Sequence, residues 1–172
     1  MSGPLKPGEE RSETARIGDR LRNLDAQLLA LEVAIDNFGP DGLQGPAWLK
    51  AYSSGDPDDL LRVNASMGTF EHIVQNVVAI AKAGGRITGQ LEQRRPRSQE
   101  SIEMLERVGA LSSAGRERLN DLFLFRSRVS HGSPDVKADE MARYAERVIA
   151  EVPPMITGIR AWLEHEGINL SA

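Results

Sequence analysis

Residues 12–38, SETARIGDRLRNLDAQLLALEVAIDNF, decide the fold class, because their apolar side chains recur in steps of four and three. On an α-helix this spacing places the apolar residues in one stripe along one face. The stripe consists of Ile17, Leu21, Leu24, Leu28, Leu31, Ile35 and Phe38. A stripe of this length packs against other helices of a bundle or against a second chain. The sequence therefore predicts a long first helix in an all-α protein.

A second long helix is predicted from the same spacing. Asp56 is suited to cap a helix, and Pro57 is suited to its first position. The four-three steps then return, and Gly84-Gly85 marks the expected end. The stripe consists of Val63, Met67, Phe70, Val74, Val77 and Ala81.

Glycine and proline mark the joints between the remaining elements. Gly39-Pro40-Asp41-Gly42 should end the first helix, and a short helical turn around Trp48, Leu49 and Tyr52 should cover the bundle. Three further helices are expected at residues 98–108, at residues 114–131, and from Pro134 onward. The last of them should kink or break at Pro153-Pro154, where the N–H donors are missing.

Strand-like alternation is absent from the sequence. The predicted fold is therefore an all-α, up-and-down bundle of four to five main helices. Residues 1–10 are expected to be a disordered tail because of their prolines, glycines and adjacent glutamates, and residues 11–172 to form a single domain.

Composition limits the classes of function. The 172 residues are 40% apolar and 27% charged, which is ordinary for a soluble domain, and no cysteine is present. Disulfides and cysteine-based zinc sites or nucleophiles are therefore excluded, in keeping with an expected cytoplasmic location. The sequence shows neither a membrane-length apolar run nor a signal-peptide core. Because the formal net charge is −4, nucleic-acid contact would need a local basic patch.

A candidate site lies in LFLFRSRVSHGSP, residues 122–134, where Arg126 and His131 stand five positions apart. Gly132 and Pro134 predict a sharp end to this helix, with Ser133 as the N-cap of the next. Five positions correspond to about 140° of rotation, so the two side chains share one face poorly. Fraying of the last helical turn could bring the two side chains together, or a second subunit could supply the other residue of the pair.

The spacing alone is weak evidence, because Arg160 and His165 repeat it near the C-terminus. The most basic stretch, residues 86–98, contains Arg86, Arg94, Arg95 and Arg97. It is either a solvated loop or a loop that contacts phosphate, since the guanidinium fork binds phosphate in a bidentate manner. The second interpretation gains weight if the fold brings this loop near Arg126.

Motifs for phosphate loops, dinucleotide binding and a nucleophile elbow are missing, and no Glu-x-x-His pair suggests a di-iron centre. We therefore expect neither a metal nor a cofactor. A histidine that moves protons and an arginine that holds an anionic phosphate are the minimum for metal-free RNA cleavage. The residues alone favour a simpler interpretation, in which the helix dipole stabilises a protonated His131 beside surface arginines.

The segment SQESIEMLERVGALSSAGRERLNDLFLFRSRVSHGSPDV, residues 98–136, resembles HepT-like proteins of the HEPN superfamily. The likeness lies in the Leu105–Gly109 turn and in the signature that runs from Phe125 to His131. It extends loosely over residues 15–165. The resemblance implies a homodimeric helical bundle whose paired arginines and histidines line one cleft. It also implies a metal-independent ribonuclease that is the toxin partner of a nucleotidyltransferase antitoxin.

By this resemblance Arg126 holds the phosphate of an RNA substrate and His131 acts as acid and base. Candidate supporting or RNA-binding residues are Ser127, Arg128, Ser133, Arg94, Arg95 and Arg97. Two positions depart from the family, because Ser127 replaces a frequent asparagine and Ser133 replaces a tyrosine common in HepT toxins. The alternative function is a non-catalytic helical module that binds RNA, a nucleotide or a partner protein through the same cleft.

Overall fold

The computed structural model describes residues 7–92, 95–131 and 135–170, and all regular structure within these ranges is helical. The all-α prediction is therefore confirmed. Of the six α-helices in these ranges, four are long and two are short. In chain order the elements are α1 (Pro7–Asp36), η1 (Gly42–Gln44), α2 (Pro46–Ser53), α3 (Pro57–Ile87), α4 (Ser98–Arg107), α5 (Ser113–Ser130) and α6 (Ala138–His165).

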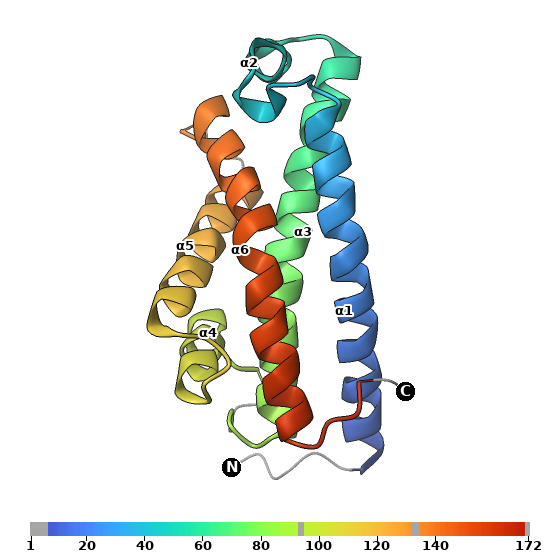
Figure 1. Ribbon diagram of the computed structural model, residues 1–172, viewed down its shortest axis with the longest axis vertical. Coiled ribbons are helices and arrows are strands. Elements are labelled where there is room, and N and C mark those ends of the chain that lie inside the picture. The colour runs from blue at the N-terminus through green and yellow to red at the C-terminus, as the bar shows by residue number, and fades with distance from the viewer. Residues whose placement is uncertain (1–6, 93–94, 132–134, 171–172) are drawn as a thin grey trace.

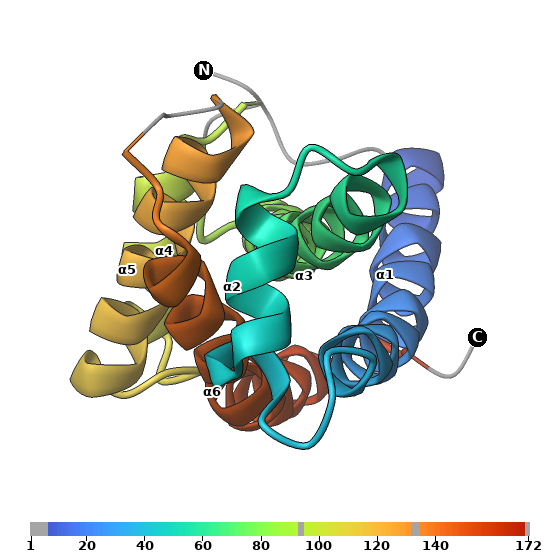
Figure 2. The ribbon, with the colours of Figure 1, turned by 90° about the horizontal axis from the view of Figure 1, so that it is seen from above.

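Helix α3 is the centre of the bundle and packs against every other α-helix. Figure 1 shows α1, α3 and α6 running along the long axis, with α5 and α4 on the far side of α6 from α1. Seen from above in Figure 2, α2 lies across one end of the bundle. The side chains of Phe70, Val74 and Val77 on α3 are fully buried. The apolar stripe that was predicted for this helix is thus the core of the protein.

The stripe predicted for α1 is also confirmed. Ile17, Leu21, Leu24, Leu31 and Phe38 are buried, while Leu28 and Ile35 are partly buried against the same core. Each fully buried leucine or isoleucine contributes about 1.5–3 kcal/mol relative to an exposed one. The four-three spacing therefore predicted both the helix and the face that it buries.

Capping and anchoring hold the ends of the central helices. The side chain of Asp56 accepts hydrogen bonds from the backbone N–H groups of Asp58 and Asp59, as predicted for the start of α3. On α2, the Trp48 Nε1 donates to the Ala138 carbonyl at 2.8 Å. The Tyr52 hydroxyl donates to the Val136 carbonyl at 2.9 Å. Helix α2 thus fastens the start of α6.

Two boundaries differ from the predictions. Helix α1 begins at Pro7, so residues 7–10, expected to be part of a disordered tail, are helical. Helix α3 does not end at Gly84-Gly85 but continues to Ile87. A Cβ atom at Gly84 would lie 2.8 Å from Leu163 Cδ2, and one at Gly85 would lie 2.6 Å from Leu91 Cδ1. These glycines permit close packing inside a helix and do not terminate it.

Helix α6 also departs from the prediction at two points. It begins at Ala138 with Lys137 as its N-cap, four residues later than expected, while the predicted Ser133 cap and Pro134 lie outside the described residues. The helix then runs without a break through Pro153 and Pro154. Both prolines are exposed, so water can satisfy carbonyl groups that lose an N–H partner. None of the helices in the described ranges is long and apolar enough to cross a membrane.

Candidate functional site

Aromatic packing fixes the position of α5 between α3 and α6. The buried Phe125 ring stacks on Tyr144 of α6 with centroids 3.8 Å apart and an interplanar angle of 6°. The same ring meets Phe70 of α3 edge-on at 5.6 Å. At the start of the helix, the Ser112 side chain accepts a hydrogen bond from the N–H of Gly115 at 3.1 Å. The end of α5 is therefore held on two sides.

Arg126 is partly buried and reaches toward α3. Its Nη2 donates to Gln75 Oε1 at 3.1 Å, while its Nε is buried without a hydrogen-bond partner. Within the described ranges it has no carboxylate partner. A buried charged donor without a partner costs about 1–3 kcal/mol or more. This guanidinium therefore has an unused donor and an unbalanced charge.

Arg126 opens onto a pocket of about 270 Å³ between α3, the start of α4 and α5. At the same pocket, the Lys82 Nζ donates to Ser98 Oγ at 2.9 Å. Burial lowers the pKa of Lys82. The complete lining consists of Gln75, Val78, Ala79, Lys82, Ser98, Phe123 and Arg126. The pocket thus carries two cations beside an apolar wall.

The basic stretch ends at this pocket. Ser98, which lines it, directly follows Arg97, so the fold does bring the end of residues 86–98 close to Arg126. Arg95 and Arg97 are exposed. Arg94 and Ser133 lie outside the described residues.

His131 is exposed and occupies the C-cap position of α5, where its N–H donates to the Ser127 carbonyl at 3.2 Å. Five positions along the helix turn it about 140° from Arg126. It lies instead on the outer face together with Leu124, whose exposed fraction is 55%. Within one chain, the two residues of the predicted pair therefore lie on different faces.

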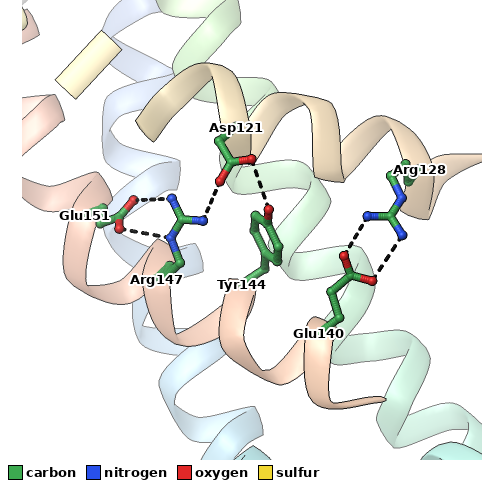
Figure 3. A network of polar contacts seen from close by, with 6 residues as sticks. All are labelled: Asp121, Arg128, Glu140, Tyr144, Arg147 and Glu151. Atoms are coloured by element: carbon green, nitrogen blue, oxygen red, sulfur yellow. Dashed lines mark hydrogen bonds and ion pairs between the residues drawn. The ribbon is translucent and has the colours of Figure 1, made fainter. Parts of the chain in front are cut away.

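Two of the supporting residues are bound within the chain. The Ser127 hydroxyl donates to the Phe123 carbonyl of its own helix at 3.2 Å. Arg128 forms a bidentate ion pair with Glu140 of α6, at 2.6 and 3.1 Å (Figure 3). This hydrogen bonding raises the pKa of Arg128. Its charge is neutralised by α6 in this structure.

A second polar cluster joins α5 to α6 (Figure 3). The Tyr144 hydroxyl donates to Asp121 at 3.0 Å, and Arg147 donates to Asp121 at 2.6 Å. Arg147 also binds Glu151 through two nitrogens, at 3.0 and 3.2 Å. Hydrogen bonding to Glu151 is the main cause that raises the pKa of Arg147. The one positive charge of this cluster is shared by two carboxylates, so the cluster holds the two helices together.

Sequence reasoning missed Gln75 and Lys82, because it followed only the apolar stripe of α3. Glu71, Gln75 and Lys82 are spaced by four and then seven positions, which places them on a single polar face. Glu71 accepts a hydrogen bond from the Ser130 hydroxyl, and Gln75 accepts one from Arg126. This polar periodicity is the sequence pattern that could have identified Gln75 and Lys82.

No group of three or more histidine, aspartate or glutamate side chains that could hold a metal ion occurs in the part of the chain that the structure describes. The chain matches no protein-family model, and comparisons with curated proteins and with solved structures give no match.

Proposed function

We propose that this protein is an endoribonuclease of the HEPN type that cleaves RNA without a metal ion. Arg126 would hold the scissile phosphate, and His131 would transfer protons. The observation that carries this proposal is the unbalanced Arg126 at the wall of a pocket, five positions before the exposed His131 that caps the same end of α5. The resemblance of residues 98–136 to HepT-like proteins adds to it.

The reaction needs two proton transfers. In the first, a base removes the proton of the 2′-hydroxyl, whose oxygen then attacks phosphorus. As the new P–O2′ bond forms, the P–O5′ bond breaks and an acid protonates the leaving 5′-oxygen. The products are a 2′,3′-cyclic phosphate and a 5′-hydroxyl. An arginine on the phosphate stabilises the additional negative charge of the transition state.

A homodimer would supply the second proton-transfer group. In a two-fold dimer the same surface meets itself, so two His131 side chains would approach one groove. Leu124 supports this arrangement because it is 55% exposed and lies on the face of α5 that carries His131. Burial of this leucine against its copy would remove apolar surface from water. The separation of Arg126 and His131 on one helix also favours a site shared by two chains.

The resemblance further suggests a toxin that is controlled by a nucleotidyltransferase antitoxin. Ser133 stands where HepT toxins commonly carry tyrosine, and the serine oxygen lies closer to the backbone. We expect a partner transferase to modify Ser133 poorly and to inhibit by binding over the cleft. Intact-mass measurement of the co-expressed proteins tests this, since an adenylyl group mapped to Ser133 would contradict it.

The activity is tested with a single-stranded RNA oligonucleotide in EDTA. Wild-type protein should produce cyclic-phosphate ends, and His131→Ala or Arg126→Ala should abolish them. The second pair with the same spacing provides the control, because Arg160 is bound to Asp25 and His165 lies at the other end of α6. Arg160→Ala and His165→Ala should retain activity. Cleavage that needs an added divalent ion, or that survives His131→Ala, would overturn the proposal.

A non-catalytic RNA-binding module is the second candidate. It is favoured by the two supporting residues that are already bound, Ser127 to its own helix and Arg128 to Glu140. In that case the wild-type protein would bind the oligonucleotide and leave it intact.

A further inference from the structure

The pocket beside Arg126 differs from three other sites of partly buried positive charge, where a carboxylate pairs with the arginine. Arg86 pairs with Glu13, Arg116 with Glu106, and Arg147 with Glu151. Lys82 and Arg126 line one pocket, and in the described ranges neither has a carboxylate partner. The protein as a whole carries a formal charge of −4. Two cations left unbalanced in one pocket of an acidic protein are complementary to an anion.

The polar atoms at the pocket are of the kind that binds a phosphate. Arg126 offers guanidinium N–H groups beyond the one used by Gln75, and Lys82 offers N–H groups beyond the one used by Ser98. The Ser98 hydroxyl and the Gln75 side chain add neutral polar groups. Burial lowers the pKa of Lys82, because removal from water disfavours the charged form. A bound anion would compensate that charge.

The size of the pocket favours a single phosphoryl group with its adjoining sugar. Its volume of about 270 Å³ lies below the range of about 300–1,000 Å³ that is typical of pockets for whole small molecules. Phe123 and Val78 supply an apolar wall beside the cations. A ribose or base edge could rest on that wall while the phosphate meets Lys82 and Arg126.

We propose that this pocket binds one phosphate group between Lys82 and Arg126, as a subsite for a nucleotide or for the RNA backbone. The proposal rests on the proposed function only for the choice of RNA as a source of the phosphate. Binding of a phosphate group in the pocket does not require that the protein cleaves RNA. Lys82 is then a binding residue that the spacing of Arg126 and His131 does not reveal.

Calorimetric titration tests the subsite with three probes, which are inorganic phosphate, adenosine 5′-monophosphate and a single-stranded RNA oligonucleotide. The RNA arm uses the His131→Ala protein so that the probe stays intact. Lys82→Met should weaken phosphate binding by roughly tenfold or more, because a charge-assisted hydrogen bond is lost. Lys82→Arg should retain most of the affinity. Lys50→Met on the exposed surface of α2 is the matched control and should change nothing.

The three probes separate the sources of the phosphate. If RNA is the source, Lys82→Met weakens RNA binding and lowers the salt dependence of that binding by about one phosphate contact. Inorganic phosphate then competes with RNA for the wild-type protein. If a free nucleotide is the source, the monophosphate binds more tightly than a phosphate within RNA and still requires Lys82. Equal binding of every probe to wild-type and Lys82→Met protein overturns the subsite. Absence of RNA cleavage by the wild-type protein overturns only the proposed function.

Discussion

Arginine side chains lie on both sides of α5, but their positive charges are compensated differently on the two sides. On the α6 side, Arg128 and Arg147 are bound to Glu140, Asp121 and Glu151, so each positive charge is balanced by carboxylates. On the α3 side, Arg126 meets only the neutral amide of Gln75 and leaves its Nε without a partner. A balanced interface holds helices together, whereas an unbalanced one carries a cost that a ligand can relieve. This difference separates the structural arginines from the candidate functional one.

The largest expected effect is on the unbalanced side. Arg126→Met should reduce RNA cleavage by about 10²–10³-fold, which is typical for the loss of one group that stabilises transition-state charge. The free energy of unfolding should stay the same or rise, because a buried donor without a partner is removed. Single-turnover cleavage and urea unfolding measure the two quantities. Arg118→Met, at an exposed position earlier on α5, is the control. A clear loss of stability in Arg126→Met would place this arginine among the structural ones.

The next effect concerns the outer face of α5. Leu124→Glu should convert the expected dimer to a monomer, because two like charges would meet at the two-fold axis. Cleavage should fall together with dimerisation. Sedimentation velocity at micromolar concentration measures the association. The control is Leu61→Glu, which changes a leucine near the start of α3 that is also exposed, at 69%. A wild-type protein that sediments only as a monomer would contradict the shared site.

A substitution on the α6 side of α5 should change the stability of the protein and leave phosphate binding unchanged. Arg147→Met should lower the free energy of unfolding by about 1–2 kcal/mol, since it removes charge-assisted hydrogen bonds to Asp121 and Glu151. Part of this effect is screened, because the Asp121 side chain is half exposed. Urea unfolding gives the value, with Arg118→Met at an exposed position of α5 as the control. Phosphate affinity should be unchanged, and a change would show that the two sides of α5 are coupled.

The smallest effect is the pH dependence contributed by Lys82. Burial lowers the pKa of this lysine in the folded protein below its ordinary value of 10.5. The cost of burying its charge is therefore fully present at neutral pH and disappears as pH rises from the folded pKa to the unfolded one. Relative to Lys82→Met, the wild-type protein should gain stability over that range. Urea unfolding at neutral and alkaline pH measures this, and a relative loss on the alkaline side would contradict it.

Apolar periodicity predicted the bundle well because burial of a stripe is a local property of each helix. It predicted the faces of α1 and α3, and the residue types Asp56 and Pro57 predicted the cap of α3. It could not predict that Gly84 and Gly85 lie inside α3, because their reason is contact with Leu163 and Leu91 from distant segments. The candidate site shows the same limit. The sequence pattern identified Arg126 as a candidate, whereas Lys82 lines the same pocket only because α3 packs on α5.

The anchoring of α2 has a consequence for the order in which the molecule assembles. The hydrogen bonds from Trp48 and Tyr52 to the start of α6 join residues 90 and 84 positions apart in the chain. Contacts of such long range form late in folding, because the entropy of closing a large loop must be overcome first. Phe125 likewise obtains its stacking partner, Tyr144, only when α6 is in place. A chain emerging from the ribosome therefore holds Arg126 and His131 on a helix that lacks its α6 contacts until α6 has been made and docked.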